Sequence, residues 1–238
     1  MTYSKKDPDT IRSMFNSIAT TYDKTNAVLS LNMHKRWNAA LIREVIVPAN
    51  PKVLLDLCCG TGAISLEYLR KVNSPIKAYL LDFSEGMLTH AKHQSAKMPL
   101  THHDISFLQA DAQQIPLLNN QVDCAVIAYG IRNIKNPQQC IQDAYRVLQP
   151  GGTLGILELT QPENPLLRFG HHLYLRTMLP LLGKCLSSNG EAYQYLCKSI
   201  PEFIHPKELQ RLMSEVGFQT IQRKSLSGGI ATLVIGKK

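Results

Sequence analysis

Acidic residues follow several short apolar runs, and the first of these acids precedes a glycine-rich turn. Asp56 stands near the end of the run at 53–57, and Gly60, Thr61 and Gly62 come directly after the two cysteines that follow it. Glycines in such a turn let the backbone approach a ligand closely. An acid beside the turn would repel a pyrophosphate but would suit a ligand that carries a cationic amine. The turn therefore predicts a binding site for a ligand of that charge.

Two more acids occupy corresponding places further along the chain. Asp82 ends the next apolar run, and Asp111 follows the one after it. An acid at the end of the second strand can accept both hydroxyls of a ribose, and Asp111 could meet an adenine amino group. Ser65 stands where a dinucleotide fingerprint has its third glycine, and no phosphate-loop lysine motif is present. Together the three acids predict a nucleoside ligand without a pyrophosphate.

The elements that would position these acids alternate between strand and helix. Apolar runs predict strands at 53–57, 78–81, 105–108, 123–129 and 153–159. Helices are predicted at 63–72, after a cap at Ser84, and at 137–148, with a turn at 150–152. A helix at 206–216 precedes strands at 220–225 and 232–235, and their short link requires a hairpin, with one antiparallel strand at the sheet edge. We therefore predict a doubly wound, mostly parallel, seven-stranded α/β sheet that binds ligands beyond its carboxyl ends.

Two segments fall outside this alternation in a chain that we interpret as a single domain, residues 1–238. Apolar residues at helical spacing predict an N-terminal helical cover over 1–47. The sheet does not need residues 161–205, which we interpret as a helical insertion over the strand ends. The insertion combines apolar and basic residues: Leu166, Leu167, Arg168, Phe169, His171, His172, Leu173, Leu175, Arg176, Met178, Leu179, Leu181, Leu182 and Lys184. It could contact substrate or an anionic membrane surface, cap the sheet, or form a homodimer interface.

Composition narrows the class of protein. The chain has 238 residues, 44% of them hydrophobic, and a formal net charge of +8. No apolar run reaches the roughly 18 residues of a membrane span, and the polar stretch 1–9 does not resemble a signal peptide. We therefore expect a cytoplasmic protein, with the inner face of the membrane as an open alternative. The basic residues are dispersed, which disfavours nucleic acid as a partner, and the six cysteines are expected to be buried thiols.

Motifs along nearly the whole chain resemble one family. The matching residues are Met14, Phe15, Ala19, Tyr22, Asp23, Asn26, Ser30, His34, Arg36, Trp37, Asp56, Gly60 to Gly62, Asp82, Ser84, Met87, Leu88, Ala110 to Ala112, Pro116, Gly130 to Asn133, Tyr145 to Leu148, Pro150 to Gly152, Pro180, Gly183, Tyr193, Tyr195, Leu196, Ser199, Ile200, Gly228 and Gly229. The stretch Gly130-Ile131-Arg132-Asn133 is the most specific piece. The pattern resembles the ubiquinone/menaquinone biosynthesis C-methyltransferases, which are class I, Rossmann-like enzymes that use S-adenosylmethionine (SAM).

The resemblance implies SAM as the methyl donor and no metal. Contacts to SAM are implied for Thr61, Asp82, Asp111 and, through its backbone, Ala112. The expected donor site consists of Asp56, Gly60, Thr61, Gly62, Asp82, Asp111, Ala112 and Ala128. Two departures from the family pattern matter. Cys58 and Cys59 replace small residues at the turn, and Ala128 replaces a serine near the donor, which removes one expected hydrogen bond.

The implied reaction is C-methylation of a polyprenyl hydroquinone. Demethylmenaquinol is the first candidate, and a ubiquinone-precursor benzoquinol or another small molecule is the alternative. Because a phenol has a pKa near 10, the site must supply a base, a cation that stabilises phenolate, or both. Arg132 is expected to stabilise phenolate, Asn133 to orient that group, Tyr22 to position the ring, and His34 to exchange protons. Bracing, packing and structural roles remain open for Arg132, Tyr22 and His34. A nucleic-acid methyltransferase and a SAM-binding scaffold without turnover are the competing interpretations.

Overall fold

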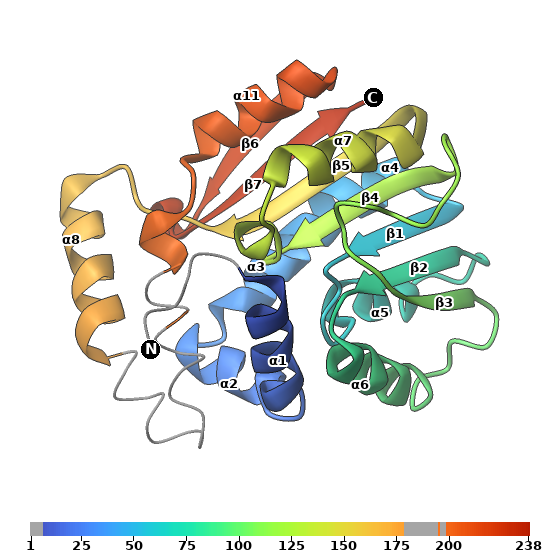
Figure 1. Ribbon diagram of the computed structural model, residues 1–238, viewed down its shortest axis with the longest axis horizontal. Helices are drawn as coiled ribbons and strands as arrows, with labels where there is room; N and C mark the ends of the chain where they lie inside the picture. The colour runs from blue at the N-terminus through green and yellow to red at the C-terminus, as the bar shows by residue number, and fades with distance from the viewer. Residues whose placement is uncertain (1–6, 179–194, 196–198) are drawn as a thin grey trace.

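The computed structural model describes residues 7–178, 195 and 199–238, and within them a single sheet forms the centre of the molecule (Figure 1). The strands are β1 (Val53–Leu57), β2 (Lys77–Asp82), β3 (Asp104–Gln109), β4 (Val122–Ala128), β5 (Leu148–Leu159), β6 (Gln219–Leu226) and β7 (Ala231–Lys237). Their order is β3-β2-β1-β4-β5-β7-β6. The first five are parallel, so the predicted doubly wound α/β sheet is confirmed. The order reverses between β1 and β4, which is where such sheets bind ligands.

The predicted antiparallel hairpin at the C-terminal end of the chain is confirmed, but its order in the sheet and the turn before the fifth strand differ from the prediction. The antiparallel strand is β7, which pairs with both β5 and β6 and so lies one place in from the edge, while β6 forms the edge. The hairpin folds back so that its second strand, not its first, meets β5. The turn expected at 150–152 belongs to β5 instead. Backbone bonds of 2.9 Å from Gly151 N to Lys238 O and from Lys238 N to Gly152 O continue the pairing through it.

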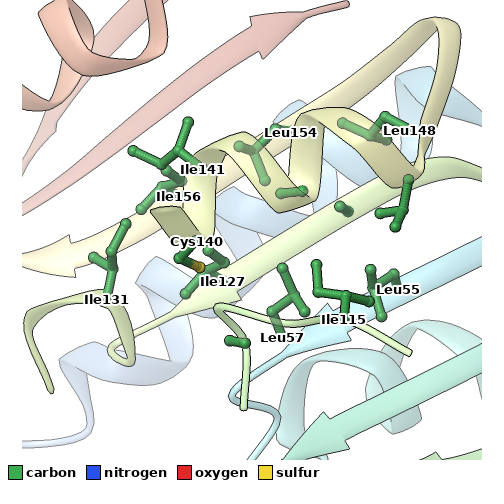
Figure 2. Packing of buried hydrophobic residues seen from close by; sticks show 14 of the residues in the cluster. Leu55, Leu57, Ile115, Ile127, Ile131, Cys140, Ile141, Leu148, Leu154 and Ile156 are labelled. Atoms are coloured by element: carbon green, nitrogen blue, oxygen red, sulfur yellow. The ribbon is translucent and has the colours of Figure 1, made fainter. Parts of the chain in front are cut away.

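Helices cover both faces of the sheet, and each face has its own hydrophobic core. The face that carries Leu55 and Leu57 packs against α7 (Pro137–Val147) and α11 (Pro206–Val216), as Figure 2 shows for α7. The other face, with Leu54 and Leu80, packs against α5 (Ala63–Leu69) and the N-terminal helices. Alternate residues of β1 therefore face opposite cores, which places Asp56 on the α5 side. Helix α6 (Glu85–Ser95) begins as predicted, because Ser84 Oγ accepts from Met87 N at 3.2 Å.

The first two N-terminal helices, α1 (Pro8–Ile18) and α2 (Tyr22–Leu29), lie beyond the carboxyl ends of the strands (Figure 1). The following elements pack on the face of the sheet that carries Leu54: α3 (Met33–Leu41), the π-helical turn η1 (Ile42–Ile46) and α4 (Val47–Ala49). Asn16 fixes α1 beside the start of α6, because its Oδ1 accepts from Ser84 Oγ at 2.7 Å and from Gly86 N at 3.0 Å. Trp37 of α3 is buried, and its Nε1 donates to Ser227 Oγ at 2.8 Å, in the short turn η4 (Ser227–Gly229).

The segment after β5 forms α8 (Pro165–Leu173) and η3 (Tyr174–Met178), which stand away from the sheet on the side of α2 (Figure 1). The Tyr174 hydroxyl donates to Leu29 O at 2.5 Å, and Leu29, Leu175 and Ile200 form a small cluster of buried residues there. The predicted insertion residues Leu179, Leu181, Leu182 and Lys184 lie outside the described residues. Within the described part of the chain, no helix is long and apolar enough to cross a membrane.

Candidate active site

The glycine turn connects β1 to α5 and depends on left-handed backbone conformations. Gly60 and Gly62 have φ of 55° and 79°, and Cys58 also has a positive φ of 54°. A Cβ atom on Gly62 would lie 2.9 Å from Leu66 Cδ1, so glycine is required there for space as well as for conformation. Gly62 is buried under the helix start, and the ligand-facing part of the turn is Gly60 and Thr61.

Asp56 lies beneath this turn and is almost completely buried. Its Oδ2 accepts a hydrogen bond of 2.7 Å from Ser65 Oγ in α5. Burial raises the pKa of Asp56 to about 7, against the opposing effect of the Ser65 hydrogen bonds. Ser65, which replaces the third glycine of the dinucleotide fingerprint, is thus hydrogen-bonded to Asp56.

Asp82 joins the end of β2 to the glycine turn. Its Oδ2 accepts from Gly60 N at 2.8 Å and its Oδ1 from Ser84 N at 2.9 Å. Burial raises the pKa of Asp82, while these backbone N–H groups favour its charged form. The turn after β1 and the segment after β2 therefore hold the Asp82 carboxylate in one orientation.

Asp111 and Ala112 continue the same edge after β3. Asp111 is exposed, and its Oδ1 accepts from Gln113 N at 2.9 Å, while Ala112 is buried. With Asp82, Gly60 and Ala128, these residues line a cavity of about 80 Å³. Its remaining wall comes partly from the N-terminal helices: Pro8, Phe15 and Tyr22. The structure thus brings five of the eight predicted donor-site residues to one cavity.

A second, larger cavity of about 1260 Å³ opens on the other side of the turn. Asp56 and Thr61 border it, together with three of the predicted catalytic residues, Tyr22, His34 and Arg132. Apolar residues form much of its wall: Leu29, Leu31, Met33, Trp37, Ile42, Val47, Leu159, Leu166, Leu167, Leu175, Ile200 and Ile230. The two cavities share one wall, made by Tyr22, Cys58, Gly60, Ala128 and Tyr129. Two ligands could therefore meet at this shared wall.

Arg132 lies next to the shared wall in a buried ion pair that the sequence did not reveal. Its side chain is 6% exposed, and its Nη1 lies 2.5 Å from Glu158 Oε1 and 2.7 Å from Tyr129 O. Glu158, 1% exposed at the end of β5, also accepts from Arg132 N at 3.2 Å and from Leu159 N at 2.8 Å. Arg132 Nε is buried and has no hydrogen-bond partner among the described residues. In the sequence, Glu158 stands out only because it is an acid inside the apolar run 153–159.

Tyr22 and Asn133 flank Arg132. Burial raises the pKa of the Tyr22 hydroxyl, and the positive charge of Arg132 opposes this rise. Asn133 lies in the 3-10 turn η2 (Ile131–Asn133) and faces the smaller cavity, where its Oδ1 accepts from the Tyr195 hydroxyl at 2.8 Å. Tyr22, Arg132 and Asn133 therefore gather around the shared wall, as their predicted roles require.

His34 of α3 also borders the larger cavity, but its side chain is hydrogen-bonded to Ser30 and not to the residues around Arg132. Its Nδ1 lies 2.6 Å from Ser30 Oγ, which also donates to Asn26 O at 2.6 Å. Partial burial lowers the pKa of His34, and the nearby Lys35 lowers it further. The ring is consequently neutral at pH 7, with Nδ1 engaged by Ser30.

Asp23 is a further residue of the site that we did not predict as a functional residue. It lies in α2 and accepts a hydrogen bond of 2.8 Å from Thr61 Oγ1 in the glycine turn. Asp23 borders the larger cavity, so the N-terminal helices bring an additional carboxylate to the turn. Across the residues that the structure describes, no group of three or more His, Cys, Asp or Glu side chains is placed to hold a metal ion.

The comparisons with known proteins agree with this arrangement. A "SAM-dependent methyltransferase, possible histamine N-methyltransferase" from Thermotoga maritima superposes with a TM-score of 0.65 at 16% identity, covering 95% of this chain and 98% of that one. The fold is therefore that of the SAM-dependent methyltransferases. The family model of the ubiE/COQ5 methyltransferases matches residues 1–238, and the chain belongs to this family. It is accordingly a SAM-dependent methyltransferase.

Two relatives match over almost their full lengths. A demethylmenaquinone methyltransferase of Protochlamydia amoebophila (strain UWE25) is 53% identical over 237 residues, which cover 100% of this chain and 98% of that protein. A demethylmenaquinone methyltransferase of Chlamydia pneumoniae is 39% identical over 236 residues, which cover 99% of this chain and 98% of that protein. The expected family resemblance is thereby confirmed.

Proposed function

We propose that this enzyme transfers the methyl group of SAM to a ring carbon of demethylmenaquinol, giving menaquinol. The observation that carries the proposal is the pair of cavities that share one wall at the glycine turn. One cavity is lined by acids that suit an adenosyl ligand, and the other is large and mainly apolar. Full-length similarity to two proteins named demethylmenaquinone methyltransferase supports the choice of quinol.

The acids fit SAM in the order in which they line the edge of the sheet. Asp111 and the backbone of Ala112 would hold the adenine, Asp82 the ribose hydroxyls, and Gly60 and Thr61 the methionine part. Asp56 would attract the cationic amine from beneath the turn, so the methionine part would reach past the shared wall to the larger cavity, which Asp56 and Thr61 border. Gly62 would contribute by its conformation alone, and Ala128 by apolar contact, because it cannot donate a hydrogen bond. SAM supplies an electrophilic methyl group on a positively charged sulfur.

The chemistry of the acceptor requires electron density on a ring carbon. Loss of the proton from the neighbouring hydroxyl raises that density, and hydrogen-bond donors aimed at the oxygen stabilise the resulting anion. After the ring carbon has taken the methyl group, it loses its own hydrogen as a proton, which restores the aromatic ring, and the oxygen is protonated again. Arg132 is suited to this role, because its buried Nε–H has no partner among the described residues. Asn133 would orient the oxygen from the other cavity, and Tyr22 would hold the ring at the shared wall.

His34 is suited to accept the hydroxyl proton, directly or through water. Its ring is neutral near pH 7, since burial lowers its pKa. The bond between Nδ1 and Ser30 leaves Nε2 as the nitrogen that can exchange protons in the cavity. The larger cavity exceeds the 300–1,000 Å³ that ordinary small-molecule sites occupy, which leaves room for part of a polyprenyl tail beside the ring.

The membrane would supply this substrate, and the surface around the larger cavity suits contact with a bilayer. Leu166, Phe169 and Leu173 lie on one side of α8 and are 79%, 69% and 53% exposed. Leu31, which borders the larger cavity together with Leu166, is 72% exposed. We name these four residues the apolar rim. Exposed basic residues stand in the same segments of the chain, in or next to α2, α3, α8 and η3: Lys24, Lys35, Arg36, Arg168 and Arg176. We infer a cytoplasmic enzyme that binds reversibly to the anionic inner face of the membrane.

A methyl-transfer assay tests the reaction. Purified enzyme with SAM and chemically reduced demethylmenaquinone should give a product that is heavier by one methylene unit and carries the new methyl on the ring. A reduced ubiquinone precursor serves as the alternative substrate, and turnover of that compound alone would replace the proposed quinol. Arg132→Ala should lower kcat strongly with little loss of SAM affinity, and Asp82→Ala should weaken SAM binding.

Vesicle flotation tests the membrane contact. The enzyme should float with vesicles that contain anionic lipid and stay behind with neutral ones, and Phe169→Ser with Leu173→Ser should abolish flotation. Leu118→Ser is the matched control, because Leu118 is 78% exposed in the loop before β4, outside the apolar rim. Equal flotation of both variants would contradict the proposal. Sedimentation that shows a dimer of wild type but a monomer of the rim variant would assign this surface to a second copy instead.

A further inference from the structure

The buried pair Arg132–Glu158 lies where methyl donor and acceptor must meet. A methyl group can pass between two ligands only where they touch, and the two cavities touch at the wall formed by Tyr22, Cys58, Gly60, Ala128 and Tyr129. Arg132 Nη1 donates to the carbonyl of Tyr129 at 2.7 Å, and its charge acts on Tyr22. Gly130, two residues before Arg132, and Asn133, directly after it, line the smaller cavity.

A guanidinium at this place creates an electrostatic conflict. The transferred methyl group of SAM is attached to a sulfonium, so the donor and Arg132 would both be positive within a largely buried site. Like charges in a region of low effective dielectric repel each other strongly. When a bound ligand carries a unit charge about 12 Å from a like charge, the repulsion weakens its affinity by about tenfold at an effective dielectric constant near 20. An unbalanced Arg132 would therefore weaken the binding of the methyl donor.

Glu158 is placed to remove this conflict. Both of its oxygens are directed to Arg132: Oε1 to Nη1 at 2.5 Å and Oε2 to the backbone N at 3.2 Å. Leu159 N fixes the carboxylate from its own strand at 2.8 Å. Glu158 borders neither described cavity, so it acts on the ligands through Arg132 and through its charge. Its pairing also occupies Nη1, which leaves Arg132 Nε without a hydrogen-bond partner among the described residues.

We propose that Glu158 is a charge-balancing and positioning residue that allows Arg132 to lie beside a cationic methyl donor. The pair presents hydrogen-bond donors to the acceptor oxygen with little net charge toward the sulfonium. This proposal rests on the proposed function, because it assumes that SAM occupies the smaller cavity. It has a consequence that a purely structural role lacks. Glu158 affects the binding of SAM, whose sulfur is charged, more than that of S-adenosylhomocysteine (SAH), whose sulfur is neutral.

Calorimetric affinities for SAM and SAH test the proposal without any turnover. Glu158→Gln keeps the size of the side chain and removes its charge, and it should lower the ratio of SAM to SAH affinity by about tenfold. SAH binding should remain near the wild-type value. Glu158→Asp, which restores the charge, should recover much of the ratio. Equal weakening of both ligands by Glu158→Gln would overturn the proposal.

Substitution of Arg132 should change the ratio of SAM to SAH affinity in the opposite direction. Arg132→Gln leaves the carboxylate of Glu158 unbalanced, so the ratio of SAM to SAH affinity should rise above the wild-type value. This measurement keeps the proposal falsifiable if Glu158→Gln does not fold, and a fall in the ratio would overturn it. Asp143→Asn is the matched control, because Asp143 forms a 2.6 Å ion pair with Arg146 on α7, and neither residue borders the two cavities. Its ratio should be unchanged.

The outcomes separate this proposal from the proposed function. If the wild-type enzyme binds neither SAM nor SAH, the assignment of the smaller cavity to the donor is wrong. If it binds both and the ratio does not respond to Glu158 or Arg132, only the charge-balancing role is wrong.

Discussion

Asp56 should make the affinity for SAM depend on pH close to neutrality. Burial raises its pKa to about 7, so about one molecule in ten carries the charge at about pH 6 and about nine in ten at about pH 8. Only the charged carboxylate attracts the cationic amine of SAM. If binding requires that form, the apparent Kd is divided by its fraction and rises about tenfold from about pH 8 to about pH 6.

Calorimetry across this pH range provides the assay, and two controls isolate Asp56. Methylthioadenosine lacks the amine, so its affinity should change little with pH. Asp56→Asn should bind SAM weakly at every pH, because the amide keeps an acceptor for Ser65 but never carries the charge. The reasoning is refuted if methylthioadenosine follows the same pH profile as SAM, or if Asp56→Asn retains the wild-type slope.

The same pKa shift predicts a change in stability of defined sign. The pKa of Asp56 is raised from its usual value of 3.8, so between pH 3.8 and about 7 the folded protein holds this proton more strongly than the unfolded chain. The contribution of Asp56 to stability therefore falls as the pH rises through that window. Asp56→Asn should raise the Tm at about pH 8, and the difference should disappear near pH 4. An equal Tm of both proteins at about pH 8 would contradict this.

Three further predictions concern packing, motion and proton transfer. A Cβ on Gly130 would lie 2.4 Å from Cys58 Cβ, so Gly130→Ala should destabilise by about 1–3 kcal/mol, whereas Gly170→Ala, with open space, should be neutral or stabilising in thermal unfolding. Helix α1 supplies Pro8 and Phe15 to the wall of the donor cavity, so bound SAM should order this helix. Spin labels on the exposed Ser13 and on α7 should therefore give a narrower distance distribution with SAM than without it. Because the pKa of His34 is lowered from 6.5, kcat should fall only below that pH, and His34→Asn should remove this acid limb.

Elements with strong local boundaries were predicted to the residue. The limits of β1 agree, since an apolar run follows Pro51 and runs into the glycine turn. The limits of α11 agree because Pro206 occupies the first turn and Gly217, with a φ of 117°, ends the helix. The pair Gly151-Gly152 misled the prediction of β5, because its conformation depends on Lys238, which lies far away in the sequence. Local chemistry decides the limits of β1 and α11, whereas the start of β5 depends on a distant partner.

The acids of the donor site were accessible to sequence reasoning because each ends a predicted strand of a parallel sheet. Glu158 and Asp23 were not, because their roles come from pairings between distant segments. Glu158 meets Arg132 only through the neighbouring positions of β4 and β5, and Asp23 meets Thr61 only after α2 has folded over the sheet. The burial of the pair Arg132–Glu158 follows from packing that no local pattern contains.

In the proposed site, the distribution of charge accounts for both the binding of a cationic donor and the release of its product. The carboxylates of Asp56 and Asp82 lie on the β1 and β2 side of the turn, while the pair Arg132–Glu158 adds little net charge on the β4 and β5 side. Methyl transfer removes the positive charge from the sulfur, so the product loses part of the attraction that held the donor. Buried charges are poorly screened by salt, so the difference between SAM and SAH affinity should persist at high ionic strength. An affinity difference that vanished in salt would place its origin at the surface, outside this pair.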